Sequence, residues 1–189
     1  MTKDLKQIVK ILKNDGIGIM PTDTIYGLVG SAFSKKAVEK IFKIKNRNKN
    51  KPLIVLISSI SDLKKFEILP SLIRANRRIL EKVWPGKVSV ILPCSSLKFK
   101  YLHRGTNSIA FRLPAKKSLI KILKETGPLV APSVNPEGQK PAQTILEAKK
   151  YFKDKVDFYL SGGTLKSKPS ILISVNKKQK IKVLRGMLK

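Results

Sequence analysis

Short apolar runs alternate with amphipathic stretches along the whole chain, and this alternation constrains the fold more than any other feature. Residues 5–12 place apolar side chains at helical spacing, and the apolar run 17–20 then predicts a strand that ends at Pro21. Ser34 can cap the next helix, whose apolar positions continue to residue 45. The same patterns predict an irregular segment over 95–107, later helices over 61–66, 70–83, 116–126 and 144–152, and later strands over 53–57, 87–92, 108–113, 129–131, 156–160, 170–175 and 180–184. Because no long linker or repeat interrupts the alternation, we predict a single mixed α/β domain over residues 1–189.

The length and composition suit one domain with its own core. The chain has 189 residues, of which 42% are hydrophobic and 28% charged, so it carries enough apolar mass to avoid disorder. No apolar run reaches the ~18–20 residues of a membrane span, and the amphipathic N-terminal segment has no signal-peptide pattern. A single cysteine, Cys94, and a single histidine, His103, cannot form a disulfide or a typical zinc site. We therefore expect a cytoplasmic protein with no structural metal and no membrane contact.

The chain is strongly basic, with 40 Lys and Arg against 12 Asp and Glu, a formal net charge of +28. One interpretation is a polyanionic partner such as nucleic acid or a phosphate-rich substrate. The other is compositional drift, because 33 of the cations are lysines, only 7 are arginines, and the lysines are spread over the whole length. Phosphate recognition usually depends on the planar arginine fork. We therefore attribute most lysines to composition and give the few arginines more weight.

Several loops next to predicted strands carry more polar groups than packing requires. The loop 21–28 (PTDTIYGL) combines two threonine hydroxyls, a carboxylate and a phenol, and residues 45–53 (KNRNKNKPL) place four cations before a buried strand. Arg112 lies inside the apolar strand 108–113, where an arginine needs an anionic partner. Each feature alone also has a structural explanation, because Thr and Asp bond their own backbone and cations complement a helix C-terminus. Further polar segments are 131–138, 161–164, 169–170 and 184–186.

In this order the polar segments resemble the motifs of the YrdC-type threonylcarbamoyl-AMP synthases, in their short single-domain form. The matching motifs are PTDTIYGL (21–28), KxR followed by PL (45–53), WPG (84–86), FRLP (111–114), APSVN (131–135), PS (169–170) and RG (185–186). The resemblance implies a twisted mixed sheet flanked by helices, with a concave, basic cavity. It also implies that L-threonine, bicarbonate and ATP are joined into threonylcarbamoyl adenylate and pyrophosphate, for the threonylcarbamoyladenosine modification of tRNA next to the anticodon.

The resemblance also implies roles for particular residues. Such chemistry depends on positioning and charge neutralisation, which agrees with the absence of a Ser/His/Asp or Cys/His set; we expect no nucleophile or general base. ATP is expected as a substrate, and Mg²⁺ is expected to be held through phosphates and water instead of protein side chains. By the resemblance, threonine is bound by Thr24, Arg112 and Ser170, and ATP by Lys45, Arg47, Ser133, Asn135 and Arg185.

Two other functions remain open at this point. The high charge suits an RNA-binding module of the same fold without catalysis, although such a module would not need the cavity residues, which are all present. A carbamoyltransferase domain is the other, but it normally belongs to a longer chain with zinc-finger-like cysteines. For the synthase, the expected partners are threonine, bicarbonate, ATP and downstream tRNA threonylcarbamoyl-transfer proteins, with at most weak RNA binding and no membrane.

Overall fold

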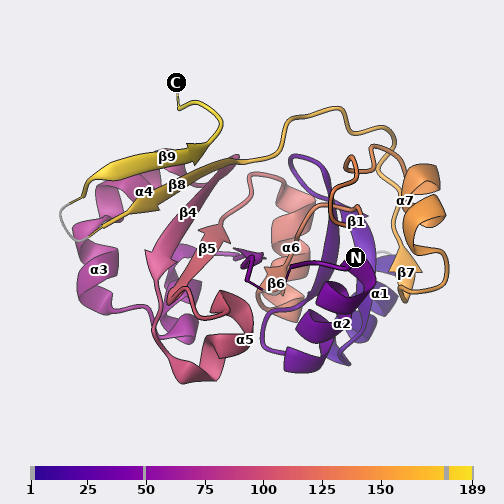
Figure 1. Cartoon of the computed structure of the whole chain (residues 1–189), viewed down its shortest axis with the longest axis horizontal. Helices are drawn as coiled ribbons and strands as arrows, with labels where there is room; N and C mark the ends of the chain where they lie inside the picture. Colours follow the sequence, from indigo (N-terminus) through magenta and orange to yellow (C-terminus); the bar gives the residue numbers. More distant parts are fainter. Residues whose placement is uncertain (1–2, 49, 177–178, 189) are drawn as a thin grey trace.

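The computed structural model describes residues 3–48, 50–176 and 179–188, and in these residues one nine-stranded sheet organises the molecule. The strands lie in the order β7-β1-β2-β6-β3-β5-β4-β8-β9, so that β7 and β9 form the two edges. Figure 1 shows β8 and β9 at one end of the molecule and β7 at the other. The strands are β1 (Ile17–Pro21), β2 (Tyr26–Ser31), β3 (Ile54–Leu56), β4 (Val88–Pro93), β5 (Ser108–Arg112), β6 (Leu129–Val130), β7 (Phe158–Tyr159), β8 (Ile171–Val175) and β9 (Ile181–Arg185).

The sheet is mixed, as the sequence predicts. β1 pairs with β7, β3 with β5 and β4 with β8 in parallel, whereas the other five neighbouring pairs are antiparallel. Short antiparallel pairs can be joined by tight turns, whereas each parallel pair needs a longer crossover connection. The longer connections bring segments from distant parts of the sequence to the same region of the sheet.

Helices cover both faces of this sheet. They are α1 (Lys3–Lys13), α2 (Lys35–Lys45), η1 (Ile60–Phe66), α3 (Pro70–Ala75), α4 (Arg77–Val83), η2 (Leu97–Phe99), α5 (Lys100–His103), α6 (Lys117–Thr126) and α7 (Ile145–Phe152). The prediction that Ser34 caps a helix is confirmed, because its hydroxyl accepts a hydrogen bond from the Ala37 amide at 3.0 Å, at the start of α2. Asn46 ends the same helix in the left-handed conformation, with φ of 49°.

Hydrophobic side chains form two layers, one on each face of the sheet, because neighbouring residues of a strand point to opposite sides. In β3, Val55 packs into the larger layer with α2, η1, α3, α4 and α7, whereas Leu56 packs into the smaller layer with α1 and α6. The smaller layer uses side chains of β1, β2, β3 and β6, such as Met20 and Leu129. Side chains of α1 and α6 therefore cover one half of this face, and the other half, over β5, β4 and β8, borders the cavity described below.

The structure differs from the sequence-based prediction in four places. The loop 21–28 is shorter than expected, because β2 begins at Tyr26; this strand is buried on both faces and lacks the alternation that marks a half-exposed strand. The predicted helix 70–83 is divided into α3 and α4 at Asn76, whose side-chain amide donates to the Leu72 carbonyl at 3.1 Å and competes with the helical pattern. The segment 95–107 contains η2 and α5. The strand predicted over 156–160 is limited to two residues.

Candidate functional site

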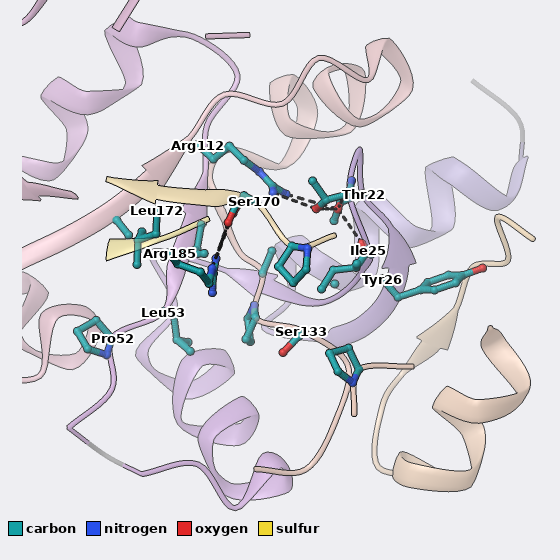
Figure 2. Close-up of a pocket in the computed structure, with 18 of the residues that line it drawn as sticks. Thr22, Ile25, Tyr26, Pro52, Leu53, Arg112, Ser133, Ser170, Leu172 and Arg185 are labelled. Carbon is teal, nitrogen blue, oxygen red and sulfur yellow. Dashed lines mark hydrogen bonds between the residues drawn. The ribbon is translucent and has the colours of Figure 1, made fainter. Parts of the chain in front are cut away.

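A cavity of about 390 Å³ opens where the ends of several strands meet the loops that follow them. Its floor is apolar and comes from the sheet, where Ile54 of β3 lies beside Ala110 of β5, which lies beside Ile91 of β4. Leu172 of β8 extends this floor toward β9. Six separate segments of the chain contribute polar side chains to its wall, among them Thr22, Thr24, Arg47, Arg112, Ser133, Ser170 and Arg185. Figure 2 shows Arg112, Ser133 and Arg185 around a common space.

Arg112 stands at the end of β5 and is 4% exposed. Its Nη1 donates to the Thr24 hydroxyl at 3.0 Å and its Nη2 to the Thr22 hydroxyl at 3.4 Å, and Nη2 lies 3.2 Å from Oδ1 of Asp23. Its Nε has no hydrogen-bond partner among the described residues. Burial lowers the pKa of Arg112, the charge of Asp23 raises it, and the charge of Arg185 lowers it. A guanidinium in these surroundings favours an additional anion nearby.

Hydrogen bonds within the loop between β1 and β2 fix the threonine hydroxyls that contact Arg112. The Thr22 hydroxyl donates to the Ile25 carbonyl at 2.7 Å, and the Thr24 amide donates to the Thr22 hydroxyl at 3.1 Å. Thr22 and Thr24 are both almost fully buried, and Figure 2 shows the Arg112 guanidinium directed toward Thr22. Some polar groups of the turn bond to one another, as a structural interpretation of the sequence predicts. Its two threonine hydroxyls also accept hydrogen bonds from Arg112, which comes from a distant strand.

On another side of the cavity, Arg185 of β9 holds Ser170. Its Nε and Nη2 donate to the Ser170 carbonyl at 3.1 and 2.9 Å, and Nη2 lies 3.3 Å from the Ser170 hydroxyl. Ser89, fully buried in β4, places its hydroxyl 2.9 Å from that of Ser170. The pairing of β8 with β4 and with β9 thus brings the Ser170 hydroxyl and the Arg185 guanidinium to the same point of the wall (Figure 2).

Lys45 lies behind this wall and is not among the residues that line the cavity. It is 1% exposed, and its Nζ donates to the Ser133 carbonyl at 2.6 Å and to the Asn135 carbonyl. Burial, followed by the nearby charge of Arg47, lowers the pKa of Lys45 to about 7, although Glu137 opposes the shift. Lys45 therefore lies under the Ser133–Asn135 turn, and the role in ATP binding that the family resemblance implies for it stays a prediction.

The remaining predicted residues divide between the wall and its support. Arg47 lines the cavity, and its Nε and Nη2 donate to the main-chain carbonyls of Lys51 and Pro52 at 3.1 and 3.0 Å. Ser133 also lines it, and its hydroxyl donates to Oδ1 of Asn135 at 2.6 Å. Asn135 is not a lining residue, because its amide is turned to the carbonyls of residues 136 and 139. Six of the eight predicted residues thus border one cavity, and two brace it from behind.

Sequence reasoning missed several members of the site. Thr22 and Tyr26 belong to the polar loop that the sequence singled out, but only Thr24 was assigned a role there. Ser89 was missed altogether, and the only sequence signal for it is one hydroxyl inside the apolar run VSVIL. A polar residue in a strand that is otherwise apolar needs a partner, and here the partner is Ser170, 81 residues further along the chain.

Comparison with known proteins identifies the family of this chain. The sequence model of the family Sua5_yciO_yrdC, described as Telomere recombination, matches residues 10–186. The chain belongs to the Sua5/YciO/YrdC family. This membership confirms the resemblance found in the sequence, and the mixed α/β fold is confirmed as well.

The family members similar to this chain differ in length. A relative from Hahella chejuensis, named threonylcarbamoyl-AMP synthase, is 29% identical over 84% of this chain and 85% of its own length. A relative of the same name from Pyrococcus abyssi is 32% identical over 76% of this chain, but the match covers only 42% of that protein. A crystal structure of P. abyssi Sua5 complexed with L-threonine superposes with a TM-score of 0.83 at 24% identity, covering 96% of this chain and 53% of the other. The chain thus spans about half of the longer relatives and most of the shorter one.

Proposed function

We propose that this chain is a threonylcarbamoyl-AMP synthase. The observation that carries the proposal is Arg112, an almost fully buried guanidinium that borders the cavity beside two threonine hydroxyls. In the part of the chain that the structure describes, its Nε has no hydrogen-bond partner. Such a group is suited to an amino-acid carboxylate, because a carboxylate accepts two charge-assisted hydrogen bonds from one guanidinium. The names of the Sua5/YciO/YrdC relatives, and a neighbour that was crystallised with L-threonine, support the same substrate.

In this proposal threonine binds at the Arg112 side of the cavity. Its carboxylate approaches the Arg112 guanidinium, and the hydroxyls of Thr24 and Ser170 bond its amino or hydroxyl group. Ser170 suits this role because Ser89 and Arg185 fix its position from two sides. A small, largely buried subsite with few polar groups is typical of sites that recognise one small metabolite.

ATP takes the rest of the cavity, beyond Ser170, where the positive charge is more open to solvent. Arg47, Arg185 and the Ser133 hydroxyl face the cavity there, and they offer donors and charge to the triphosphate. Asn135 and Lys45 act on ATP through the turn that carries Ser133, since both are bonded to that turn. This assignment keeps the predicted ATP side but gives Lys45 and Asn135 an indirect part in it.

The proposed reaction needs positioning more than an acid or base from the protein. The threonine amine and bicarbonate combine to a carbamate with loss of water. A carbamate oxygen then attacks the α-phosphorus of ATP, the bond from that phosphorus to the bridging oxygen breaks, and pyrophosphate leaves with the bonding electrons. Holding the carbamate and ATP in line, with cations near the departing charge, supplies much of such catalysis.

Mg²⁺ fits this cavity as a partner of the phosphates. Asp23 is the carboxylate nearest to Arg112, and it is already paired with that guanidinium. Among residues 3–48, 50–176 and 179–188, no three His, Cys, Asp or Glu side chains gather as metal ligands. Phosphate oxygens and water would therefore supply most of the ligands, as this ion prefers, and the ion would neutralise charge on the triphosphate.

The product would serve proteins that transfer the threonylcarbamoyl group to tRNA, in the cytoplasm. Synthesis itself uses only threonine, bicarbonate and ATP, and residues 1–189 form the single domain that performs it. In the described part of the chain, no helix is long and apolar enough to cross a membrane. The charge of +28 favours a second candidate, an RNA-binding module without catalysis, but that function does not require the buried Arg112 and its threonine partners.

The test is to incubate the purified chain with ATP, L-threonine and bicarbonate and to measure pyrophosphate and threonylcarbamoyl adenylate. We expect equal amounts of both products, and no adenylate when either threonine or bicarbonate is omitted. Pyrophosphate without the adenylate, or no turnover with threonine at concentrations up to the millimolar range, would reject the proposal. Addition of tRNA should leave the initial rate unchanged, whereas tight tRNA binding with no pyrophosphate release would favour the RNA-binding candidate.

A further inference from the structure

The connection between β7 and β8 crosses nearly the whole sheet. β7 is one edge strand and β8 is next to the other edge, so six strands of the sheet lie between the two ends of this connection. Figure 1 shows this connection running across one end of the molecule from the side of α7 to β8. We call residues 161–169 the strap. The strap is largely exposed, and it ends at Pro169 and Ser170, which line the cavity.

One buried side chain holds the beginning of the strap. The hydroxyl of Tyr26 donates to the Gly163 carbonyl at 2.7 Å and accepts from the Gly162 amide at 2.9 Å. Tyr26 itself is fully buried at the start of β2, and Figure 2 shows its hydroxyl pointing away from the cavity centre. The strap passes so close to β1 that a Cβ on Gly162 would lie 2.6 Å from the Pro21 ring. A phenol that makes both a donor and an acceptor bond to one short main-chain segment fixes its position and direction.

Beyond this point the strap has few attachments. The Leu165 amide donates to the Gln143 carbonyl at 2.8 Å, and Lys166, Ser167 and Lys168 are exposed. The far end is held again at Ser170, by Arg185 and Ser89. The path of the strap toward the cavity therefore depends on its two ends and on Leu165 between them, whose amide makes this bond and whose partly buried side chain packs against the larger hydrophobic layer.

We propose that Tyr26 is a positioning residue, whose hydroxyl sets the path of the strap and thereby the placement of Ser170 in the cavity wall. Tyr26 also lies in the same loop-to-strand segment as Thr22 and Thr24, so its ring connects the threonine loop to the strap. A single phenol thus fixes the position of the loop that carries Thr22 and Thr24 relative to Ser170 across the cavity. The kinetic part of this inference rests on the proposed function, whereas the structural part does not.

The test compares Tyr26→Phe with Tyr101→Phe, measuring amide exchange by NMR on the full chain and steady-state kinetics. Tyr101 is the matched control, because its hydroxyl also donates to one main-chain carbonyl, that of Ala32 at 2.8 Å. In Tyr26→Phe we expect exchange at Gly162 and Leu165 to rise at least about 10-fold, with little change in the core strands. We expect the KM for threonine to rise about 3- to 10-fold with a smaller change in kcat, and neither effect in Tyr101→Phe.

A second variant, Gly162→Ala, keeps the phenol but moves the strap, because the added methyl collides with Pro21. It should reproduce the rise in KM while both variants keep the cooperative unfolding of the parent chain. Unchanged exchange at Gly162 and Leu165 in Tyr26→Phe would overturn the inference. So would an unchanged KM in Tyr26→Phe, or a rise in KM that Tyr101→Phe shares. If the parent chain makes no adenylate, the proposed function fails, and the exchange data still decide whether Tyr26 holds the strap.

Discussion

The two sides of the cavity hold their arginines in different ways. Arg112 is 4% exposed and contacts side chains, namely Asp23 and two threonine hydroxyls. Arg47 and Arg185 are more exposed, and their guanidinium groups donate to main-chain carbonyl oxygens. A desolvated guanidinium whose neighbours leave room for one anion selects the anion that fits. A guanidinium near water contributes positive charge and discriminates less by the shape of the anion. This difference supports the proposed function, in which the Arg112 side recognises a small carboxylate and the other arginines neutralise a triphosphate.

The largest effect should follow the loss of the buried guanidinium. Arg112→Ala should raise the KM for threonine about 10- to 100-fold, since a charge-assisted pair contributes ~1.5–3 kcal/mol. It also leaves the buried Asp23 without its cation, which lowers the free energy of unfolding by about 3–5 kcal/mol. Arg112→Lys separates the two effects, because it retains the charge beside Asp23 but loses the fork, so a raised KM should persist with a smaller loss of stability. Initial rates at varied threonine, with the exposed Arg74→Ala as control, would show this, and unchanged threonine kinetics in Arg112→Lys would contradict it.

The supporting position of Lys45 predicts a pH-dependent effect. Because the pKa of Lys45 is lowered to about 7 in the folded chain, the unfolded chain binds the extra proton between pH 7 and the ordinary lysine range. The free energy of unfolding should therefore rise with pH above 7, by as much as about 1 kcal/mol per pH unit. Lys45→Met removes this dependence and should raise the KM for ATP, because the Ser133 and Asn135 carbonyls lose their donor.

Urea unfolding of the parent chain and Lys45→Met at pH 6, 7.5 and 9 checks the pH prediction. The exposed Lys43→Met on the same helix is the matched control and should follow the parent chain. If the parent chain and Lys45→Met change in parallel with pH, Lys45 keeps an ordinary pKa and its burial has no such consequence.

The more exposed arginines should show a smaller, nucleotide-specific effect. Arg47→Ala and Arg185→Ala should each raise the KM for ATP several-fold and change the KM for threonine less, because they face the proposed phosphate side. Each should lower the free energy of unfolding by only about 0.5–1.5 kcal/mol per lost hydrogen bond to a carbonyl. Fluorescence titration with a non-hydrolysable ATP analogue, beside thermal melts and an Arg78→Ala control, measures both quantities. A large loss of stability without loss of ATP affinity would make these arginines structural.

The smallest specific effect belongs to the surface lysines. If they reflect composition, RNA should bind weakly and lose about 10³- to 10⁵-fold in affinity between ~50 and ~200 mM salt, as for 6–10 phosphate contacts. Lys64→Ala, at an exposed position of η1, should change neither substrate KM. Filter binding at the two salt concentrations, with tRNA that carries the modifiable adenosine and tRNA that lacks it, tests this. Tight, salt-tolerant preference for the first tRNA would give the lysines a function of their own.

Periodicity in the sequence predicted most elements of the fold, and its failures have physical reasons. The amphipathic helices and half-buried strands follow directly from their apolar spacing, as in α2 with its Ser34 cap. β2 escaped prediction because burial on both faces removes the alternation, and its glycines weaken any strand signal. Asn76 divides a helix through a side-chain bond that spacing alone cannot predict.

The candidate site could be predicted where motifs carry several polar groups, and not where one residue acts through a distant partner. The sequence placed Thr24 and Arg112 in one site through the family motifs, and the structure brings them within hydrogen-bond distance. It could not distinguish lining from supporting positions, because the direction of the Lys45 side chain depends on a turn about 90 residues away. Ser89 stayed hidden for the same reason, since its partner becomes visible only when β4 pairs with β8.

The most direct test of the central claim compares the binding of L-threonine and L-threoninol, which lacks the carboxylate, by isothermal titration calorimetry. The parent chain should bind threonine at least about 10-fold more tightly, because only threonine offers the anion that Arg112 can hold in a largely dry wall. In Arg112→Lys this preference should shrink, and in a folded Arg47→Ala it should be unchanged. Equal affinity of the parent chain for the two ligands would contradict the assignment of Arg112 to the carboxylate.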